Sequence, residues 1–212
     1  MIEFLSPVSK QVVAHREILP VGVFGKQIAL HKDAGDLPDL KDVKFALFGI
    51  KENRNDVDFM GEEISFDPIR KALYSLYPGN WKHGIVDLGD IDKGSSIEDT
   101  YFAVKTVVSA LLKKNIIPLM LGGCQDLVYG QYRGYDQLGG MVNMVNVDTS
   151  FDLGDADQPM SNKSYVGKIV VEKPYNLFNY STIGYQSYFN PPGEIALMEK
   201  LFFDAYRLGQ VS

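Results

Sequence analysis

Residues 115–152 read NIIPLMLGGCQDLVYGQYRGYDQLGGMVNMVNVDTSFD, and this stretch decides the expected fold. It holds two apolar runs of strand length, Ile116–Leu121 and Met141–Val147, each followed by turn residues. A segment of helical length, Asp126–Leu138, lies between them and ends at Gly139-Gly140. Strand, helix and strand in this order predict a parallel unit with both polar loops at the carboxyl edge of one sheet. Because ligands bind at that edge in open α/β sheets, we expect any active site there.

Strands and helices also alternate in the rest of the chain. Residues 1–40 show no clear period and predict an irregular or partly helical lead-in. Apolar runs predict further strands, which are Lys44–Ile50, Gly84–Leu88, Lys168–Val171 and Thr182–Gly184. A final helix is expected from about Glu194 to Arg207. This alternation predicts a mainly parallel sheet with helices on both faces.

Two helices are predicted from the residues at their starts. Asp67 is expected to be the N-cap of the first, with Pro68 at its first helical position. The expected apolar face of that helix consists of Ile69, Leu73, Leu76 and Tyr77. The second helix follows Ser96, which can form a capping box with Asp99. Its apolar residues recur at helical spacing and include Ile97, Tyr101, Val104, Val108, Leu111 and Leu112.

The composition bounds the class of protein. The 212 residues include 45% apolar residues and carry a net charge of −6, which argues against a general nucleic-acid-binding surface. The single cysteine excludes an internal disulfide framework and suits a reducing compartment. The N-terminus lacks the features of a secretory signal, and no apolar run approaches the ~20 residues that span a bilayer. We therefore expect one cytoplasmic domain over residues 1–212, without a membrane or nucleic-acid partner. Its C-terminal part is expected to be incomplete, because the sequence stops where a further strand would begin.

Asp148 and Asp152 are the strongest candidates for chemistry. They lie four positions apart, directly after an apolar strand. Two carboxylates at a strand's carboxyl edge can bind one cation, or can act as an acid and a base. The alternative is that both carboxylates accept hydrogen bonds from turn amides, as aspartates in loops often do.

The loop at residues 122–126 offers weaker candidates. Gly122-Gly123 permits a tight turn but lacks the spacing of a dinucleotide-binding or P-loop motif, so a nucleotide-binding domain is a weak competitor. Gln125 and Asp126 can bind a ligand or cap the following helix. Cys124 lies near an expected helix N-terminus, which would lower the pKa of its thiol. Because no histidine is expected beside it as a base, we interpret Cys124 as a packed residue and not as a nucleophile.

Four motifs, in order, resemble the arginase/agmatinase/formimidoylglutamase (ureohydrolase) family. FDPIRKALYSLY at residues 66–77 is similar to the family's Gly-Pro-x-x-Ile-Arg element. Asp87–Asp90 (DLGD) matches Asp-x-Gly-Asp, and Gly122–Gln125 (GGCQ) stands where the family has Gly-Gly-x-His. Asp148–Asp152 (DTSFD) stands where it has Asp-x-His-x-Asp. Tyr129-Gly130 and the Glu-Asn-Arg loop after the first strand look like the formimidoylglutamase branch.

The resemblance implies a three-layer α/β/α fold with a binuclear manganese centre, whose bridging hydroxide attacks an amidine or guanidine carbon. It implies that Asp148 and Asp152 are carboxylate ligands of the metal, and it places Gln125 and Ser150 at the two histidine positions. A glutamine carbonyl and a serine hydroxyl are weaker ligands of a transition metal than an imidazole. The family's further Asp-x-Asp ligand motif has no match in these residues. We therefore expect manganese to be absent or weakly bound, and no catalytic residue is assigned.

Two hypotheses follow from the resemblance, beside the nucleotide-binding alternative. One is a hydrolase of C–N bonds in a small amidine or guanidine substrate, with an altered metal site. The other is a non-catalytic relative that binds a small molecule or serves an assembly. The family assembles as trimers and hexamers, so the resemblance also implies a homo-oligomer.

Overall fold

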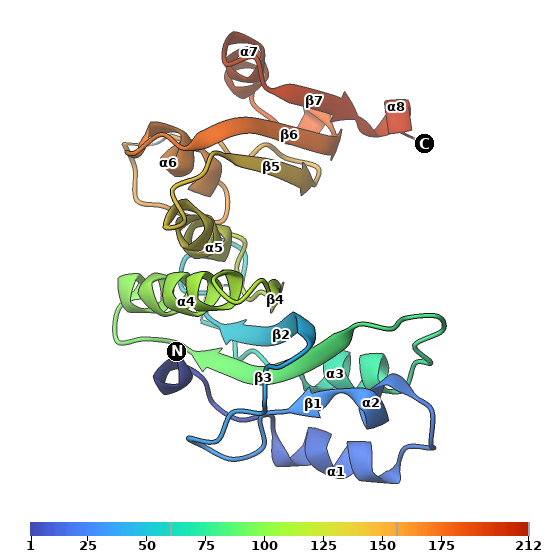
Figure 1. Cartoon of the computed structure of the whole chain (residues 1–212). Coiled ribbons are helices and arrows are strands. Elements are labelled where there is room, and N and C mark those ends of the chain that lie inside the picture. Colours follow the sequence, from blue (N-terminus) through green and yellow to red (C-terminus); the bar gives the residue numbers. More distant parts are fainter. Residues whose placement is uncertain (60, 156, 212) are drawn as a thin grey trace. The chain divides into compact units, whose positions relative to one another are not determined.

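The computed structural model describes residues 1–59, 61–155 and 157–211 (Figure 1). The chain divides into two compact units. The first unit contains Met1–Arg54 and Gly61–Gly123, and the second contains Asn55–Met60 and Cys124–Ser212. Each is an α/β unit around its own parallel sheet, which confirms the predicted fold class. The expectation of one domain over residues 1–212 stays a prediction.

The sheet of the first unit has the strand order β1-β3-β2-β4, with all neighbours parallel. These strands are β1 (Ala29–Leu30), β2 (Val43–Lys51), β3 (Gly84–Asp92) and β4 (Ile117–Leu121). Three of them were predicted, although β2 and β3 are longer than expected. The lead-in was expected to be irregular or partly helical, and it also supplies β1, which is too short to show a sequence period.

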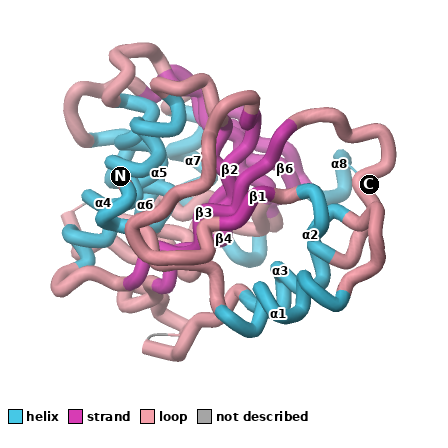
Figure 2. Tube along the Cα trace, turned by 60° about the horizontal axis from the view of Figure 1, so that its bottom comes forward, coloured by secondary structure: helices cyan, strands magenta, loops and turns pink. Residues whose placement is uncertain are grey.

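The helices of the first unit lie on both sides of its strands. They are α1 (Lys10–Ile18), α2 (Phe24–Gln27), α3 (Asp67–Tyr74) and α4 (Ile97–Leu112). In Figure 2, α4 lies to one side of the strands and α1 to α3 lie to the other. The predicted capping box of α4 is present, since Ser96 and Asp99 hydrogen-bond each other's backbone N–H. This unit therefore has the expected three layers.

The prediction for α3 is wrong in two respects. Its N-cap is Phe66, and Asp67 is the first helical residue. The predicted apolar face is also wrong, because Ile69, Leu76 and Tyr77 are exposed and Leu73 is only partly buried. The helix instead buries Arg70 and Tyr74. Both side chains turn toward the sheet because they hydrogen-bond Asp87 of β3, so a polar interaction decides which face is buried.

The second unit has the strand order β5-β6-β7, again parallel. The strands are β5 (Val142–Val147), β6 (Leu177–Tyr185) and β7 (Asp204–Arg207), and the helices are α5 (Leu127–Asp136), α6 (Tyr165–Val171), α7 (Pro192–Lys200) and α8 (Leu208–Val211). A core around Phe151, Tyr165 and Tyr180 joins α5, α6 and β6. The strand, helix and strand predicted from residues 115–152 are all present. The prediction that both strands belong to one sheet is wrong, because β4 pairs with β2 in one sheet and β5 pairs with β6 in another.

Two predictions in the second unit are wrong. Lys168–Val171, predicted as a strand from its β-branched residues, belongs to α6. Tyr165, Val166 and Ile169 are buried there at helical spacing, and this tertiary packing overrides the local strand preference. The helix expected up to Arg207 ends at Lys200, and Asp204–Arg207 pairs with β6 as a strand.

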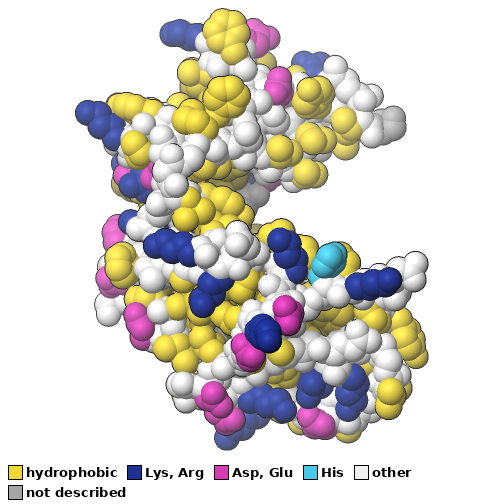
Figure 3. Space-filling model, viewed as in Figure 1, with side chains coloured by type: hydrophobic (Ala, Val, Ile, Leu, Met, Phe, Trp, Pro, Cys, Tyr) yellow, Lys and Arg dark blue, Asp and Glu magenta, His cyan; other side chains and the backbone are white. Residues whose placement is uncertain are grey.

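Charged side chains of both signs are interspersed on the face shown in Figure 3, with no large area of one sign. Within residues 1–59, 61–155 and 157–211, no helix is long and apolar enough to cross a membrane. The absence of a nucleic-acid partner stays a prediction.

Candidate functional site

The loop after β5 brings the predicted aspartates to the carboxyl end of that strand. Asp148 is half-buried, and Asp152 is 2% exposed. Asp152 has a φ of 53°, in the left-handed region that aspartate and asparagine tolerate better than most residues. The turn also buries Phe151 in the core of the second unit, which explains why an apolar residue separates the polar ones.

The two residues at the expected histidine positions hydrogen-bond the two aspartates. The Gln125 amide donates to Asp148 Oδ2, and Ser150 Oγ donates to Asp152 Oδ1 over 2.7 Å. Asp148 Oδ1 also accepts from the backbone N–H groups of Thr149 and Ser150. The structure thus places Gln125, Asp148, Ser150 and Asp152 together, as predicted from residues 115–152. It also shows that the carboxylates are partnered by neutral donors.

Asn190 fixes this loop and was not identified from the sequence. Its side chain is buried, and Oδ1 accepts from Phe151 N–H over 2.8 Å while Nδ2 donates to Thr149 O over 2.9 Å. Tyr180 OH adds a hydrogen bond to Phe151 O over 3.1 Å. Asn190 precedes Pro191-Pro192, and consecutive prolines indicate a turn. This turn signal is the sequence feature that points to Asn190.

Asp152 has the most perturbed carboxyl group of this loop. Burial raises the pKa of Asp152 to about 6, the hydrogen bond from Ser150 opposes this rise, and the charge of Asp148 adds to it. Oδ2 of Asp152 is buried and has no hydrogen-bond partner within the described part of the chain. An unpartnered buried carboxylate oxygen destabilises the folded state at neutral pH.

Asp152→Asn is expected to stabilise the second unit at neutral pH. The folded-state pKa of Asp152 is raised, so the folded state binds a proton that the unfolded state releases, and stability falls as pH rises from about 4 to about 6. The asparagine removes this fall and suits the left-handed backbone, which should raise the free energy of unfolding by roughly 1 to 3 kcal/mol at neutral pH. Urea denaturation across this pH range measures it.

Asp157→Asn, at an exposed position of the same segment, is the matched control for that experiment. It should leave both the stability and its pH dependence unchanged. The prediction is wrong if the free energy of unfolding falls equally with rising pH in the Asp152→Asn variant and in the unsubstituted protein. Ionisation of Asp152 would then not destabilise the folded state.

Cys124 is buried, and the prediction that a helix N-terminus lowers the pKa of its thiol is wrong. Burial raises the pKa of Cys124, and a hydrogen bond to the carboxylate of Asp126 raises it further. Asp126 is itself fully buried and accepts from Asn55 Nδ2 over 3.1 Å. A thiol held in its protonated form is a poor nucleophile, so the interpretation of Cys124 as a packed residue agrees with its surroundings.

The Glu-Asn-Arg loop after β2 contains an ion pair that the sequence analysis did not identify. Glu52 is 1% exposed and accepts from Arg54 Nε over 2.9 Å and from Thr100 Oγ1 over 2.8 Å. Arg54 also donates to the backbone oxygens of Gly94 and Ser95 after β3. Burial opposes ionisation of Glu52, but the hydrogen bonds from Arg54 hold its pKa below the usual value. This pair ties together the loops after two neighbouring strands.

Position 123 requires glycine, because a Cβ there would overlap the carbonyl oxygen of Glu52. This close approach of two backbones is the physical reason for the Gly-Gly turn after β4. It places the turn against the Glu52–Arg54 loop within the first unit.

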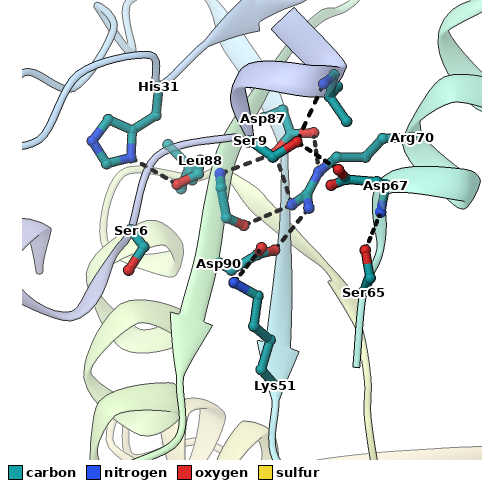
Figure 4. Close-up of polar contacts among 12 residues, drawn as sticks. Ser6, Ser9, His31, Lys51, Ser65, Asp67, Arg70, Asp87, Leu88 and Asp90 are labelled. Atoms are coloured by element: carbon teal, nitrogen blue, oxygen red, sulfur yellow. Dashed lines mark hydrogen bonds and ion pairs between the residues drawn. The ribbon is translucent and has the colours of Figure 1, made fainter. Parts of the chain in front are cut away.

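The Asp-x-Gly-Asp motif at the end of β3 forms a buried ionic network (Figure 4). Asp87 accepts from Arg70 Nε over 2.8 Å and from Tyr74 OH over 2.7 Å. Asp90 lies 2.8 Å from Arg70 Nη1 and 3.2 Å from Lys51 Nζ. Arg70 and Asp87 are fully buried, so this motif holds α3 on the sheet.

Comparison with known proteins decides the family. The model of the arginase family matches residues 43–212 of this chain. The chain belongs to the arginase family.

Among curated arginase-family relatives, a formimidoylglutamase of Streptococcus gordonii is 26% identical over 168 residues, which is 73% of this chain and 50% of that protein. A formimidoylglutamase of Hahella chejuensis is 29% identical over 146 residues, 64% of this chain and 44% of that protein. The chain therefore spans about half the length of the curated relatives that it matches.

Solved arginase-family structures share the fold. The formimidoylglutamase of Bacillus subtilis matches with a TM-score of 0.69 and 19% identity, covering 82% of this chain and 58% of that one. The agmatine ureohydrolase of Thermoplasma volcanium matches with a TM-score of 0.68 and 20% identity, covering 94% and 66%. A Trypanosoma cruzi formiminoglutamase, solved with Mn²⁺, matches with a TM-score of 0.69 and 15% identity, covering 83% and 64%.

Gln125, Asp148, Ser150 and Asp152 do not by themselves supply the ligands of the binuclear manganese centre that the resemblance to the family implied. The orphaned Asp152 Oδ2 is one feature that would suit a cation. Yet no group of three or more His, Cys, Asp or Glu side chains that could hold a metal occurs among the described residues. The two positions expected to supply imidazole nitrogens supply an amide and a hydroxyl that donate to the carboxylates instead. Two metal ions need more anionic and imidazole ligands than these four residues offer.

Proposed function

We propose that this chain is a non-hydrolytic member of the arginase family, whose candidate site binds a small amidine or guanidine compound without manganese. The observation that carries the proposal is the pair of hydrogen bonds from Gln125 to Asp148 and from Ser150 to Asp152. Neutral donors at these two positions suit carboxylates that carry no metal ion. A histidine at either position would instead offer a lone pair to a cation.

The ligand class is supported by the relatives and by the charge of the loop. The relatives include formimidoylglutamases and an agmatine ureohydrolase, and agmatine is a guanidine. Amidines and guanidines present several N–H donors, which complement carboxylate oxygens directly. Asp148 is half-buried and reaches solvent, so its carboxylate is the group that such a ligand can contact.

A hydrolysis assay tests the catalytic half of the proposal. With formimidoylglutamate and added manganese, the chain should release no formamide beyond manganese alone, because Gln125 and Ser150 replace the two expected imidazole ligands beside Asp148 and Asp152. The Streptococcus gordonii enzyme serves as the positive control. Formamide release in proportion to the amount of this chain would overturn the non-hydrolytic assignment.

Calorimetry without metal tests the binding half. Formimidoylglutamate should bind, and Asp148→Asn should weaken this binding about tenfold or more, the loss expected when a charge-assisted hydrogen bond becomes a neutral one. Asp155→Asn, at an exposed position beyond the loop, is the control and should bind normally. Equal affinity for both variants would place the ligand elsewhere.

One observation favours a second candidate, a hydrolase of the same family. Asp152 Oδ2 is buried and free of hydrogen bonds in the described chain, as a carboxylate oxygen that ligates a metal would be. This candidate requires ligands beyond Asp148 and Asp152. It predicts that manganese binds with the stoichiometry of the family's centre.

A further inference from the structure

The first unit contains two cavities that share a wall. One has a volume of about 380 Å³ and the other of about 340 Å³, and both are lined by Phe24, Trp81 and Ile85. They lie toward the amino ends of β2 and β3, which begin at Val43 and Gly84. The Gly122-Gly123 turn follows the carboxyl end of β4, so the cavities lie at the opposite end of these strands.

The larger cavity is apolar throughout. Strand pairing sets Phe45 beside Ile85 and Leu47 beside Leu119, so these four side chains lie on one face of the sheet. Phe24 of α2 and Leu73 of α3 complete this lining together with Pro78 and Trp81. Leu119, on the edge strand β4, remains 39% exposed at this cavity. The cavity therefore presents an apolar surface of the size that a small ligand fills.

Trp81 is held in place as the common wall. Its ring lies 5.1 Å from the ring of Phe45 and 5.3 Å from that of His83, between ring centroids. Trp81 Nε1 donates to the backbone oxygen of His83 over 3.0 Å. Trp81 is 44% exposed, and its indole N–H already has an acceptor. A ligand would therefore contact mainly the apolar ring.

The smaller cavity adds a positive charge. Lys82 lines it beside Gln27 and His83, and no carboxylate of the described residues lines either cavity. Lys82 forms none of the salt bridges found among those residues. In a chain with a net charge of −6, an unpaired lysine beside an apolar cavity is complementary to an anionic group attached to an apolar body.

We propose that these two cavities form a binding site for a small carboxylate with an aromatic body. The aromatic ring occupies the apolar cavity against Phe45 and Trp81, and the carboxylate lies beside Lys82. Charge selects a carboxylate over an amine of the same size, and the absence of polar groups in the larger cavity selects an aromatic body over a sugar or a nucleotide.

Titration of the full chain with 3-phenylpropionate tests this proposal. Trp81 is the only tryptophan of the chain, so its fluorescence reports on ligands that contact the shared wall. The expected result is a saturable change, with affinity for 3-phenylpropionate about three- to fivefold above that for 3-phenylpropanol, the ratio equivalent to one partly exposed ion pair. Phenethylamine should bind more weakly than the alcohol. Isothermal calorimetry provides the same ranking without the fluorophore.

Two variants and one control locate the ligand. Lys82→Gln should abolish the preference for the carboxylate while keeping the affinity for the alcohol. Lys114→Gln, at an exposed lysine in the turn after α4, should change neither. Leu119→Phe should fill the apolar cavity and weaken both ligands by about tenfold, a loss equivalent to excluding most of a buried ring. Circular dichroism confirms that the variants are folded. Equal affinity for the acid, the alcohol and the amine would overturn the proposal, as would binding that Leu119→Phe leaves unchanged.

Discussion

Asp87→Ala is expected to lower the free energy of unfolding by about 3 to 5 kcal/mol, the cost of leaving one member of a buried ion pair without its partner. Arg70 is fully buried, and its Nε donates to Asp87 over 2.8 Å. Tyr74 OH and Gly89 N–H also donate to the same carboxylate, over 2.7 Å and 3.0 Å. Removing that carboxylate leaves Arg70 with Asp90 and the backbone oxygen of Gly89 as its remaining partners, and it leaves Tyr74 OH and Gly89 N–H without their acceptor.

Asp92→Ala on the same strand is the matched control for this experiment. The Asp92 side chain is 57% exposed and pairs with Lys51 over 3.1 Å at the surface. Its loss should cost less than about 1 kcal/mol, the usual value for an exposed pair. Urea denaturation followed by circular dichroism measures both variants. Equal losses for the two would show that burial gives the Arg70–Asp87 pair no special importance and that α3 is held by other contacts.

Gln125→His combined with Ser150→His is expected to raise the affinity for manganese by at least about tenfold, a gain of about 1.4 kcal/mol. The substitutions replace two donors to the carboxylates by two imidazole nitrogens in the same loops. Both changes also free Asp148 and Asp152 to face a cation, and neutral imidazole is a better ligand for a transition metal than an amide or a hydroxyl. Isothermal calorimetry with manganese chloride measures the change.

Gln131→His, a partly buried position on α5 outside the two loops, controls for an added histidine alone. It should leave manganese affinity unchanged. No gain for the double variant would mean that the loops of residues 122–125 and 148–152 do not correspond to the arginase-family metal motifs in the way proposed.

Local sequence signals correctly predicted the helices and strands that are specified by their own residues. The capping box of Ser96 and Asp99 and the apolar runs of β2, β4 and β5 specify those elements without distant partners. The pattern of residues 115–152 also predicted that the loops after β4 and β5 would meet, and Gln125 does donate to Asp148. The predicted reason, a shared edge of one sheet, is wrong because β4 and β5 belong to different sheets.

Contacts between residues far apart in the sequence determine the features that were not predicted. Arg70 and Tyr74 reverse the expected face of α3 because Asp87 lies opposite them, which no periodicity of α3 shows. Asn190 fixes the Asp148–Asp152 loop from about forty residues away in the sequence, a long-range contact that no local pattern shows. The β-branched run of Lys168–Val171 becomes helical because the core of the second unit buries one side of it. In each case a long-range contact outweighs the local pattern.

The number of manganese ions bound per chain is the most direct test of a metal-free candidate site. The protein is dialysed against excess manganese, freed of unbound metal and measured by plasma mass spectrometry, with the Streptococcus gordonii formimidoylglutamase treated in parallel. We expect well below one manganese ion per chain, because Gln125 and Ser150 donate to the carboxylates of Asp148 and Asp152. A value of about two ions per chain, the number in a binuclear centre, would contradict this expectation.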